Sequence, residues 1–320
     1  MLSPINLTND VKLVNKISYK FISDGYNFAN VKLHEFYKIK EFVEIYKCNQ
    51  TGLLFADSQL KEGDGQFYNE LSKNDWYYVD TRWFYDFVLQ KLNANSKILE
   101  IGCGKGSFLN LLKKHNFNHL GIDFNNEAVN HCLSMGLNAS TKSTSELFEM
   151  NQKYDFIFAF EVLEHIKNIN EFFLNLKKIL KLGGMFCFSV PNSSNPIYFV
   201  DEYLKISDFL NPDSYKLYRI ATSLNLPPHH FNYFNINNIK KIAEFYGFTL
   251  NYFEYQPYNV DLTDTLISLY LNRYIPFLNI YKKSDFIFSK LIKIAGFLLS
   301  NKYYSLRGQS IYCELKLTKI

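Results

Sequence analysis

Cysteine is scarce in this chain, and its distribution excludes a disulfide framework. The 320 residues include five cysteines, an odd number, and they are scattered along the sequence. A disulfide-stapled scaffold instead carries an even number of cysteines in a short chain. We therefore expect reduced thiols and a cytoplasmic protein. The five positions are Cys48, Cys103, Cys132, Cys187 and Cys313.

Long apolar runs are also lacking. The most apolar late stretch, residues 286–299, is interrupted by Lys290 and Lys293. It is shorter than the roughly 18 residues that a membrane-spanning helix needs. The first residues, MLSPINLTNDVKL, have neither the basic flank nor the apolar segment of a signal peptide. The sequence therefore predicts no transmembrane segment and no secretion signal.

Neither sign of charge predominates. The chain has 35 Lys and Arg against 31 Asp and Glu, a formal net charge of +4, without a polybasic tract. Proteins that bind nucleic acid or anionic membranes usually carry such a tract, so we expect neither partner. There is also no internal repeat. The length suffices for one large domain, or for one domain with an appendage.

The most informative stretch that is present is ILEIGCGKGSFL, residues 98–109. An apolar run, three glycines at alternate positions and a second apolar run predict a buried parallel strand, a tight turn and a helix. Glycines let a ligand approach the main chain, and the first N–H groups of the helix point at its negative end. The spacing is GxGxG rather than the GxGxxG of NAD-binding turns, and Glu100 precedes it. The spacing therefore favours a different cofactor.

Further elements follow in a regular order. About 20 residues on, the apolar stretch at residues 121–124 contains Asp123, a carboxylate at a strand end that can accept hydrogen bonds from a ribose diol. Four more strands are predicted, with a glycine turn before the second and Pro191 closing it. They cover residues 154–160, 185–190, 247–250 and 309–317.

This ordered set resembles the class I S-adenosylmethionine-dependent methyltransferases, over residues 75 to 320. The resemblance implies an α/β, Rossmann-like sheet of seven strands, the last one antiparallel, with helices on both faces. It implies S-adenosyl-L-methionine as cofactor, wrapped by the glycine-rich loop. The cofactor-binding residues that it implies are Glu100, Gly102, Cys103, Gly104, Gly106, Asp123, Phe124 and Phe160.

The segment FEVLEHI, residues 160–166, carries the expected chemistry. A helical turn after the strand would place Glu161, Glu164 and His165 at i, i+3 and i+4, on one face. This ExxEH pattern resembles the ubiquinone-pathway and small-RNA 2′-O-methyltransferases, in which these residues and a later histidine hold a divalent cation. Here His229, in the segment PPHHF, supplies the later histidine. The resemblance thus implies an Mg²⁺ or Mn²⁺ site, since mixed O and N ligands suit these ions.

A metal-free alternative stays open. In it, the first carboxylate caps backbone N–H groups and His165 packs near the cofactor. His229 and His230 then act as a base and a positioning group, or only donate to the backbone of their loop. A neutral imidazole is suited to accept a proton from a poorly nucleophilic hydroxyl. The predicted catalytic residues under either alternative are Glu164, His165, His229 and His230.

The chain also carries segments outside this core. Residues 1–74 form an N-terminal extension in which residues 44–55 resemble half of the zinc ribbon that precedes the core of some sugar methyltransferases. Only Cys48 remains, and one thiolate cannot build a tetrahedral zinc site, so we expect a metal-free hairpin. Aromatic residues at 67–68 and 76–84 either cover the cofactor or pack on the sheet. An insertion at about 192–235 is predicted to wall the substrate pocket. Another, at 261–307, is predicted to be a helical lid, a homodimer surface or a peripheral membrane contact.

The predicted function is O-methylation of a small or glycan-linked hydroxylated substrate, most plausibly a sugar in surface-polysaccharide or glycosylated-metabolite synthesis. Methylation of carbon or nitrogen on a similar substrate is one alternative, and 2′-O-methylation of RNA is another that the modest charge disfavours. An inactive Rossmann scaffold that binds a partner is a third. The intact glycines and Asp123 argue against this last alternative.

Overall fold

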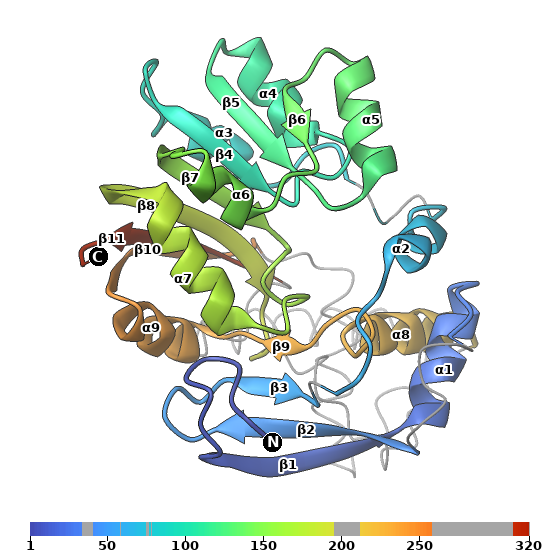
Figure 1. Cartoon of the computed structure of the whole chain (residues 1–320). Coiled ribbons are helices and arrows are strands. Elements are labelled where there is room, and N and C mark those ends of the chain that lie inside the picture. Colours follow the sequence, from blue (N-terminus) through green and yellow to red (C-terminus); the bar gives the residue numbers. More distant parts are fainter. Residues whose placement is uncertain are drawn as a thin grey trace, which may run out of the picture.

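The computed structural model describes residues 1–33, 41–57, 59–74, 77, 79–194, 212–257 and 310–319. These residues form a seven-stranded sheet and a separate four-stranded sheet (Figure 1). The predicted helical insertion at 261–307 lies outside the described residues.

The large sheet has the strand order β10-β11-β8-β7-β4-β5-β6. Neighbouring strands from β8 to β6 are parallel, whereas β11 runs antiparallel to both β8 and β10. The expected seven-stranded sheet with an antiparallel last strand is therefore confirmed. Its strands are β4 (Lys97–Ile101), β5 (Asn118–Ile122), β6 (Ala139–Ser140), β7 (Tyr154–Phe160), β8 (Leu180–Pro191), β10 (Phe248–Tyr255) and β11 (Ser310–Leu317).

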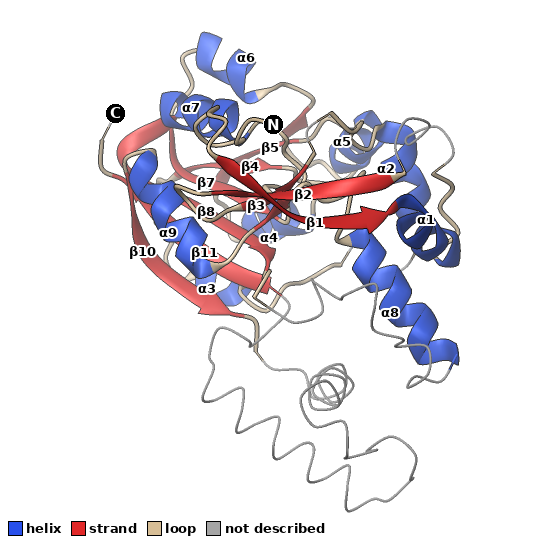
Figure 2. Ribbon diagram, turned by 90° about the horizontal axis from the view of Figure 1, so that it is seen from below, coloured by secondary structure: helices blue, strands red, loops and turns tan. Residues whose placement is uncertain are grey.

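Helices cover both faces of this sheet, as Figure 2 shows from below. Because side chains alternate along a strand, Ile157 and Ala159 of β7 join one apolar cluster and Phe158 and Phe160 join another. The first cluster includes α7 and α9, and the second includes α3 and α4. A strand with both faces buried needs a continuous apolar run, which β7 has. The helices around the sheet are α3 (Tyr85–Leu89), α4 (Ser107–Lys114), α5 (Asn126–Ser134), α6 (Thr144–Glu149), α7 (Ile169–Ile179) and α9 (Ile236–Phe245).

The small sheet is antiparallel, with the order β1-β2-β3-β9. Three of its strands come from the N-terminal extension: β1 (Val11–Ser18), β2 (Phe42–Cys48) and β3 (Leu54–Ala56). The hairpin of β2 and β3 turns at residues 49–53, next to Cys48. The fourth strand, β9 (Asn232–Tyr233), comes from the far end of the insertion at 192–235 and pairs with β3.

Three helices lie beside the small sheet: α1 (Tyr19–Phe28), α2 (Gly65–Leu71) and α8 (Pro212–Leu224) (Figure 1). Helices α1 and α8 approach closely at Gly25, where a Cβ atom would meet Ser223 Oγ at 1.9 Å and the Arg219 carbonyl oxygen at 2.5 Å. The Tyr26 hydroxyl donates to the Leu226 carbonyl over 3.1 Å. The N-terminal extension therefore packs directly on the insertion. None of the described helices is long and apolar enough to cross a membrane.

One buried ion pair ties α3 to the last strand. Lys91, just after α3, places its Nζ 2.6 Å from Oε1 of Glu314, whose side chain is 3% exposed. The same ammonium lies over the rings of Phe87 and Tyr252, 3.8 Å and 4.3 Å from their centroids. The buried carboxylate is therefore neutralised by a cation that two aromatic rings hold, and the same oxygen accepts from the Tyr312 hydroxyl at 3.1 Å.

We expect the substitution Lys91→Met to lower the free energy of unfolding by about 3 kcal/mol, because it leaves a buried charge uncompensated. Urea denaturation of the single variant measures the loss. Adding Glu314→Gln removes the stranded charge and should recover most of it. Equal stability of Lys91→Met and the unmodified protein would show that the pair contributes nothing.

Candidate active site

The glycine-rich loop follows β4 in a backbone conformation that side chains rarely adopt. Gly102, Gly104 and Gly106 have φ values of +71°, +51° and +83°. The backbone N–H groups of Gly102 and Cys103 both donate to the Ile122 carbonyl at the end of β5, over 2.7 Å and 3.1 Å. Positive φ at three alternate residues explains the spacing of the glycines.

Protein side chains occupy the space that two of these glycines leave. A Cβ atom on Gly102 would lie 2.5 Å from Cγ2 of Val162, and one on Gly106 would lie 2.6 Å from Cδ1 of Leu137. Val162 belongs to the turn after β7. The loop and that turn are therefore packed against each other at the carboxyl ends of β4 and β7, where ligands bind in such sheets.

Two carboxyl groups flank the loop. Asp123 accepts from the Gly104 N–H through Oδ2 at 2.9 Å and from the Asn125 N–H through Oδ1 at 2.8 Å. Burial raises the pKa of Asp123, although these two bonds lower it. The Oε2 atom of Glu100 is buried and has no hydrogen-bond partner among the described residues. Carboxylate oxygens carry more than one lone pair, so Asp123 can accept further hydrogen bonds from a ligand that presents hydroxyl donors. Glu100 is 4% exposed and lies in β4 just before the loop.

The two aromatic residues predicted at the cofactor lie in different surroundings. Phe124 is 65% exposed, and its ring meets the edge of Tyr68 of α2 at 5.5 Å. Phe160, at the end of β7, is buried against Phe84 and Phe108, with ring centroids 4.9 Å and 5.1 Å away. Phe124 is therefore accessible to a ligand at the loop, while Phe160 packs in the core.

The expected helical turn at residues 161–166 is not formed. Glu161 has a φ of +54°, residues 163–165 form a turn, and α7 begins only at Ile169. A right-handed helix requires negative φ, so a helix cannot start at Glu161. The prediction that Glu161, Glu164 and His165 share one helical face is therefore wrong.

The two glutamates of this turn lie in different surroundings. Oε1 of Glu161 accepts from the Ser189 hydroxyl at 2.7 Å and lies 3.9 Å from Nη1 of Arg82. Glu164 is 1% exposed, and neither of its carboxyl oxygens has a hydrogen-bond partner among the described residues. Burial, and then the charge of Glu161, raise the pKa of Glu164 well above its usual value. Glu164 is therefore a carboxyl group that burial favours in its neutral form.

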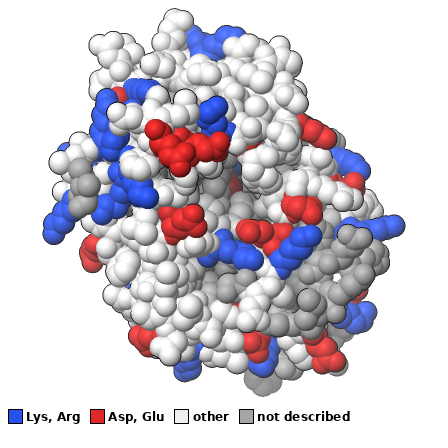
Figure 3. Space-filling model, in the orientation of Figure 1, with Lys and Arg blue, Asp and Glu red and all other residues white. Residues whose placement is uncertain are grey.

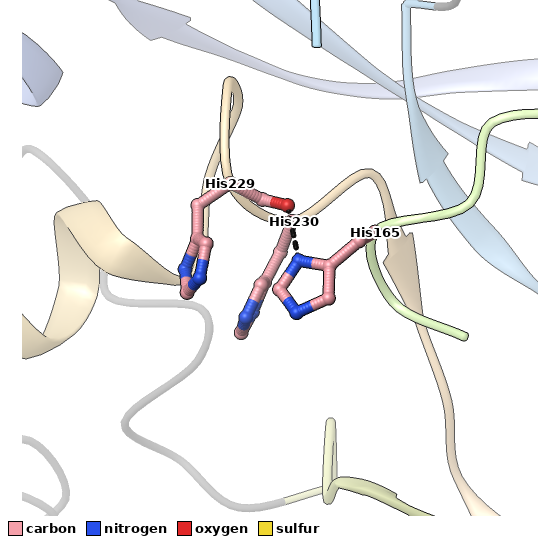
Figure 4. Close-up of side chains that lie close together, drawn as sticks. All are labelled: His165, His229 and His230. Atoms are coloured by element: carbon pink, nitrogen blue, oxygen red, sulfur yellow. Dashed lines mark hydrogen bonds between the residues drawn. The ribbon is translucent and has the colours of Figure 1, made fainter. Parts of the chain in front are cut away.

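The imidazole rings of three histidines, His165, His229 and His230, converge in one cluster (Figure 4). The ring centroids of His165 and His229 are 4.5 Å apart, those of His165 and His230 are 4.9 Å apart, and those of His229 and His230 are 4.3 Å apart. One nitrogen of each ring lies within 4.8 Å of the others. The sequence predicted that these histidines share a site. His165 and His229 are 64 positions apart, so tertiary packing brings them together.

Backbone carbonyls fix the protonation of two of these rings. Nδ1 of His165 donates to the His229 carbonyl at 2.7 Å, and Nδ1 of His229 donates to the Leu224 carbonyl at 2.9 Å. A carbonyl oxygen only accepts, so the proton of each neutral ring is on Nδ1. In the neutral rings the lone pair is therefore on Nε2. In His229 this atom has no partner among the described residues. In His165 it lies 3.9 Å from Oε1 of Glu164, and the ring also interacts with the backbone of Glu161.

Burial keeps the three imidazoles neutral. It lowers the pKa of His165 to about 4. Burial, together with the neighbouring imidazoles, lowers the pKa of His229 and of His230 well below the usual value. Aromatic rings of the N-terminal region supply part of this burial, since three of them have centroids about 6 Å from His229: Phe67 at 6.1 Å, Tyr68 at 5.9 Å and Tyr77 at 6.0 Å.

A pH titration of stability tests this neutral state. In the unfolded chain His230 binds a proton near pH 6.5, whereas in the folded chain it does not, so its contribution to stability falls as pH drops from 7 to 5. We expect the stability of the unmodified protein relative to His230→Gln to fall by about 2 kcal/mol over this range. Urea denaturation of both proteins, after dialysis against chelator, measures it.

The stability of the unmodified protein is compared with that of His230→Gln, and not taken alone, because other buried groups change stability with pH in the opposite direction. The raised pKa values of Glu100 and Glu164 stabilise the fold as pH falls, and they do so in both proteins. His165 and His229, which face His230, are also common to both. A difference in stability that does not change with pH would show that His230 has an ordinary pKa.

The ligand set predicted for a metal ion is only partly brought together. Of its four members, His165 and His229 have ligand atoms in one group, and that group adds His230 but includes neither Glu161 nor Glu164. The reason is the positive φ of Glu161, which leaves its carboxylate on Ser189 rather than on the histidines.

Two residues of this region were not predicted. Ser189, near the end of β8, holds Glu161, and Asn232 of β9 holds the turn that carries Glu164 and His165. Ser189 interrupts an apolar run just before Pro191, which is a usable sequence signal. Asn232 carries none, because asparagine is frequent throughout this chain.

The surface in the orientation of Figure 1 mixes the two signs of charge. Figure 3 shows Lys and Arg interspersed with Asp and Glu on this face, and a hollow between the regions of the two sheets. This face shows no continuous basic stripe of the kind that tracks a nucleic acid backbone.

The strand order, the glycine loop and the strand-end carboxylate together define a Rossmann-like methyltransferase. The chain belongs to the methyltransferase domain family, whose model matches residues 77–252. It is an S-adenosylmethionine-dependent enzyme, as the sequence predicted.

Curated relatives carry one recurring name. A ubiquinone biosynthesis O-methyltransferase of Rickettsia bellii (strain OSU 85-389) is 26% identical over 201 residues, which cover 55% of this chain and 83% of the relative. A protein of the same name from Rickettsia akari (strain Hartford) is 29% identical over 125 residues, which cover 35% of this chain and 50% of the relative.

Solved structures of S-adenosylmethionine-dependent methyltransferases also match this chain. An S-adenosylmethionine-dependent methyltransferase from Archaeoglobus fulgidus matches with a TM-score of 0.47 and 18% identity, covering 72% of this chain and 90% of that chain. An S-adenosylmethionine-dependent methyltransferase from Mesorhizobium loti matches with a TM-score of 0.44 and 14% identity, covering 74% and 99%.

Proposed function

We propose that the enzyme methylates a hydroxyl oxygen of a small acceptor and that His165 accepts the hydroxyl proton. The observation that carries this proposal is the bond from Nδ1 of His165 to the His229 carbonyl, which leaves Nε2 as a proton acceptor. His165 is also the most open of the three rings, with a side chain that is 21% exposed against 8% and 7% residue exposure for His229 and His230.

The residues around the glycine loop fit the cofactor. Asp123 would hold the ribose hydroxyls, and the backbone of residues 102–106 would line the methionine part. Glu100, in β4 just before the loop, would support the loop. Phe124 offers an exposed ring beside this site. When bound, S-adenosylmethionine supplies an activated methyl group.

The low pKa of His165 is compatible with this function. A hydroxyl oxygen that forms a bond to carbon becomes positively charged, and its O–H proton then becomes strongly acidic. Nε2 of His165 can take that proton even though burial has made the ring a weak base. The proton then leaves readily, because the buried site disfavours the charged imidazolium.

The proposed acceptor is a sugar or another small hydroxylated compound, and this proposal comes from the sequence. The half-ribbon at residues 44–55 and the segment PPHH resemble sugar methyltransferases, whereas the curated relatives are named for ubiquinone biosynthesis. The test is to incubate the enzyme with S-adenosylmethionine and either methyl α-D-glucopyranoside or catechol, and to detect a methyl ether by mass spectrometry. Methylation of an amine or carbon nucleophile, with no methyl ether from any hydroxyl compound, would overturn the proposal.

A second candidate mechanism adds a divalent cation. It is favoured by the three ring nitrogens within 4.8 Å and by the two unpartnered oxygens of Glu164 beside them. A cation held there would lower the pKa of an acceptor hydroxyl. Dialysis against chelator distinguishes the two mechanisms, since loss of activity that Mg²⁺ or Mn²⁺ restores supports only the second.

A further inference from the structure

The turn with His165 and the segment with His229 and His230 are held together by backbone bonds. The N–H groups of Phe231 and Asn232 both donate to the Glu164 carbonyl, over 2.7 Å and 3.1 Å. Together with the bond from His165 to the His229 carbonyl, these contacts join the histidine segment to the turn at Glu164 and His165.

One side chain extends this connection across the whole turn. The Asn232 amide nitrogen donates to the Ile166 carbonyl at 2.6 Å and to the Leu163 carbonyl at 3.3 Å. These two carbonyls flank Glu164 and His165 on either side. Both N–H groups of the amide are therefore used, and no apolar side chain could replace them.

Asn232 is itself fixed from the opposite side. It is 3% exposed and pairs with Phe55 of β3 in the small sheet. The neighbouring Phe231 carbonyl accepts from the Ala56 N–H at 2.8 Å. The residue thus connects three segments: the turn after β7, the histidine segment and the N-terminal hairpin.

We propose that Asn232 is a positioning residue that sets the geometry of His165 against His229 and His230. It acts through the turn, because its side-chain amide donates to the two backbone carbonyls that bracket Glu164 and His165. The N-terminal hairpin is thereby part of the catalytic unit, since it anchors the strand that carries Asn232. This inference rests on the proposed function, in which His165 must keep its Nε2 lone pair.

The test compares two buried asparagines. Asn232→Leu removes the amide donors and keeps the approximate volume. Asn238→Leu is the matched control, because Asn238 is also a buried asparagine, 1% exposed. Its amide donates to the carbonyl of Tyr233, the other residue of β9, at 3.1 Å and accepts from the Asn235 N–H at 3.0 Å, so none of these bonds reaches the turn. NMR of the full chain labelled with ¹⁵N-histidine reports the tautomer of each ring, and His165→Gln identifies the signals of His165.

We expect His165 to be protonated on Nδ1 in the unmodified protein and in Asn238→Leu, and to exchange between tautomers in Asn232→Leu. An unchanged His165 in Asn232→Leu would overturn the proposal, as would the same change in both variants. If Asn232→Leu does not fold, Asn232→Ser, which keeps a single short donor, replaces it in the same comparison.

An activity measurement separates this proposal from the proposed function. With the acceptor that is methylated, we expect kcat of Asn232→Leu to fall about tenfold or more, since small misplacements of a reacting group are costly, while calorimetry shows unchanged binding of S-adenosylmethionine. Reduced cofactor binding with unchanged kcat would overturn the positioning role. If no hydroxyl compound is methylated, the proposed function fails, while the tautomer comparison still decides whether Asn232 positions His165.

Discussion

The substitution Gly104→Val is expected to abolish binding of S-adenosylmethionine while leaving the protein folded. Gly104 has a φ of +51°, a conformation that a β-branched residue rarely adopts. Its N–H also donates to Asp123, so a shift of this residue displaces the carboxylate expected to hold the ribose. A valine side chain would in addition fill space beside the backbone that the methionine part of the cofactor is expected to approach.

A matched glycine separates backbone strain from loss of the site. Gly183, near the start of β8, has a φ of +80°, and a Cβ atom on it would meet nothing within 4 Å. Gly183→Val thus introduces similar strain away from the loop. Titration calorimetry should show binding to the unmodified protein and to Gly183→Val, and none to Gly104→Val. Unmodified affinity in Gly104→Val would show that the cofactor binds elsewhere.

The substitution His165→Gln is expected to reduce kcat by about 10² to 10⁴, the usual range for loss of a general base. Glutamine is similar in size and polarity but has no lone pair of comparable basicity. Binding of S-adenosylmethionine should be unchanged, because the proposed role of His165 is toward the acceptor hydroxyl, whereas the residues proposed to hold the cofactor are those of the glycine loop and Asp123. The rate of methyl ether formation and the calorimetric affinity of the cofactor measure the two effects.

The matched control is His119→Gln. Nδ1 of His119 also contacts a backbone carbonyl, that of Phe117 at 2.8 Å, but His119 lies on β5 three residues before its carboxyl end. This variant should retain full kcat. Activity of His165→Gln equal to that of the unmodified protein would leave catalysis to alignment of the reactants alone, with no protein base.

The parts of this fold that the sequence predicts correctly are those governed by local rules. Glycines at 102, 104 and 106 have positive φ, and the apolar strand at 154–160 is buried on both faces. The pattern that predicts each feature, glycine spacing or a continuous apolar run, lies within a few positions, although distant helices supply the burial of the strand. Steric limits on φ and the alternation of side chains along a strand act at that range.

The active-site turn shows where the local pattern misleads. The spacing of Glu161, Glu164 and His165 predicts a helical face, yet Glu161 adopts positive φ and its carboxylate accepts from Ser189 on the neighbouring strand. A contact made by tertiary packing therefore outweighs the helical pattern. The three residues still reach one region, but through a turn held by Asn232 rather than through a helix.

The sequence by itself determined the methyltransferase sheet and the glycine-rich loop, and it singled out the histidines as candidates, because spacing and residue type suffice for these. Only the tertiary structure decided that His165, His229 and His230 form one buried cluster and that an N-terminal hairpin anchors it through β9. The physical reason is that burial and strand pairing depend on segments more than 60 residues apart. Those contacts set the pKa and the tautomer of each histidine.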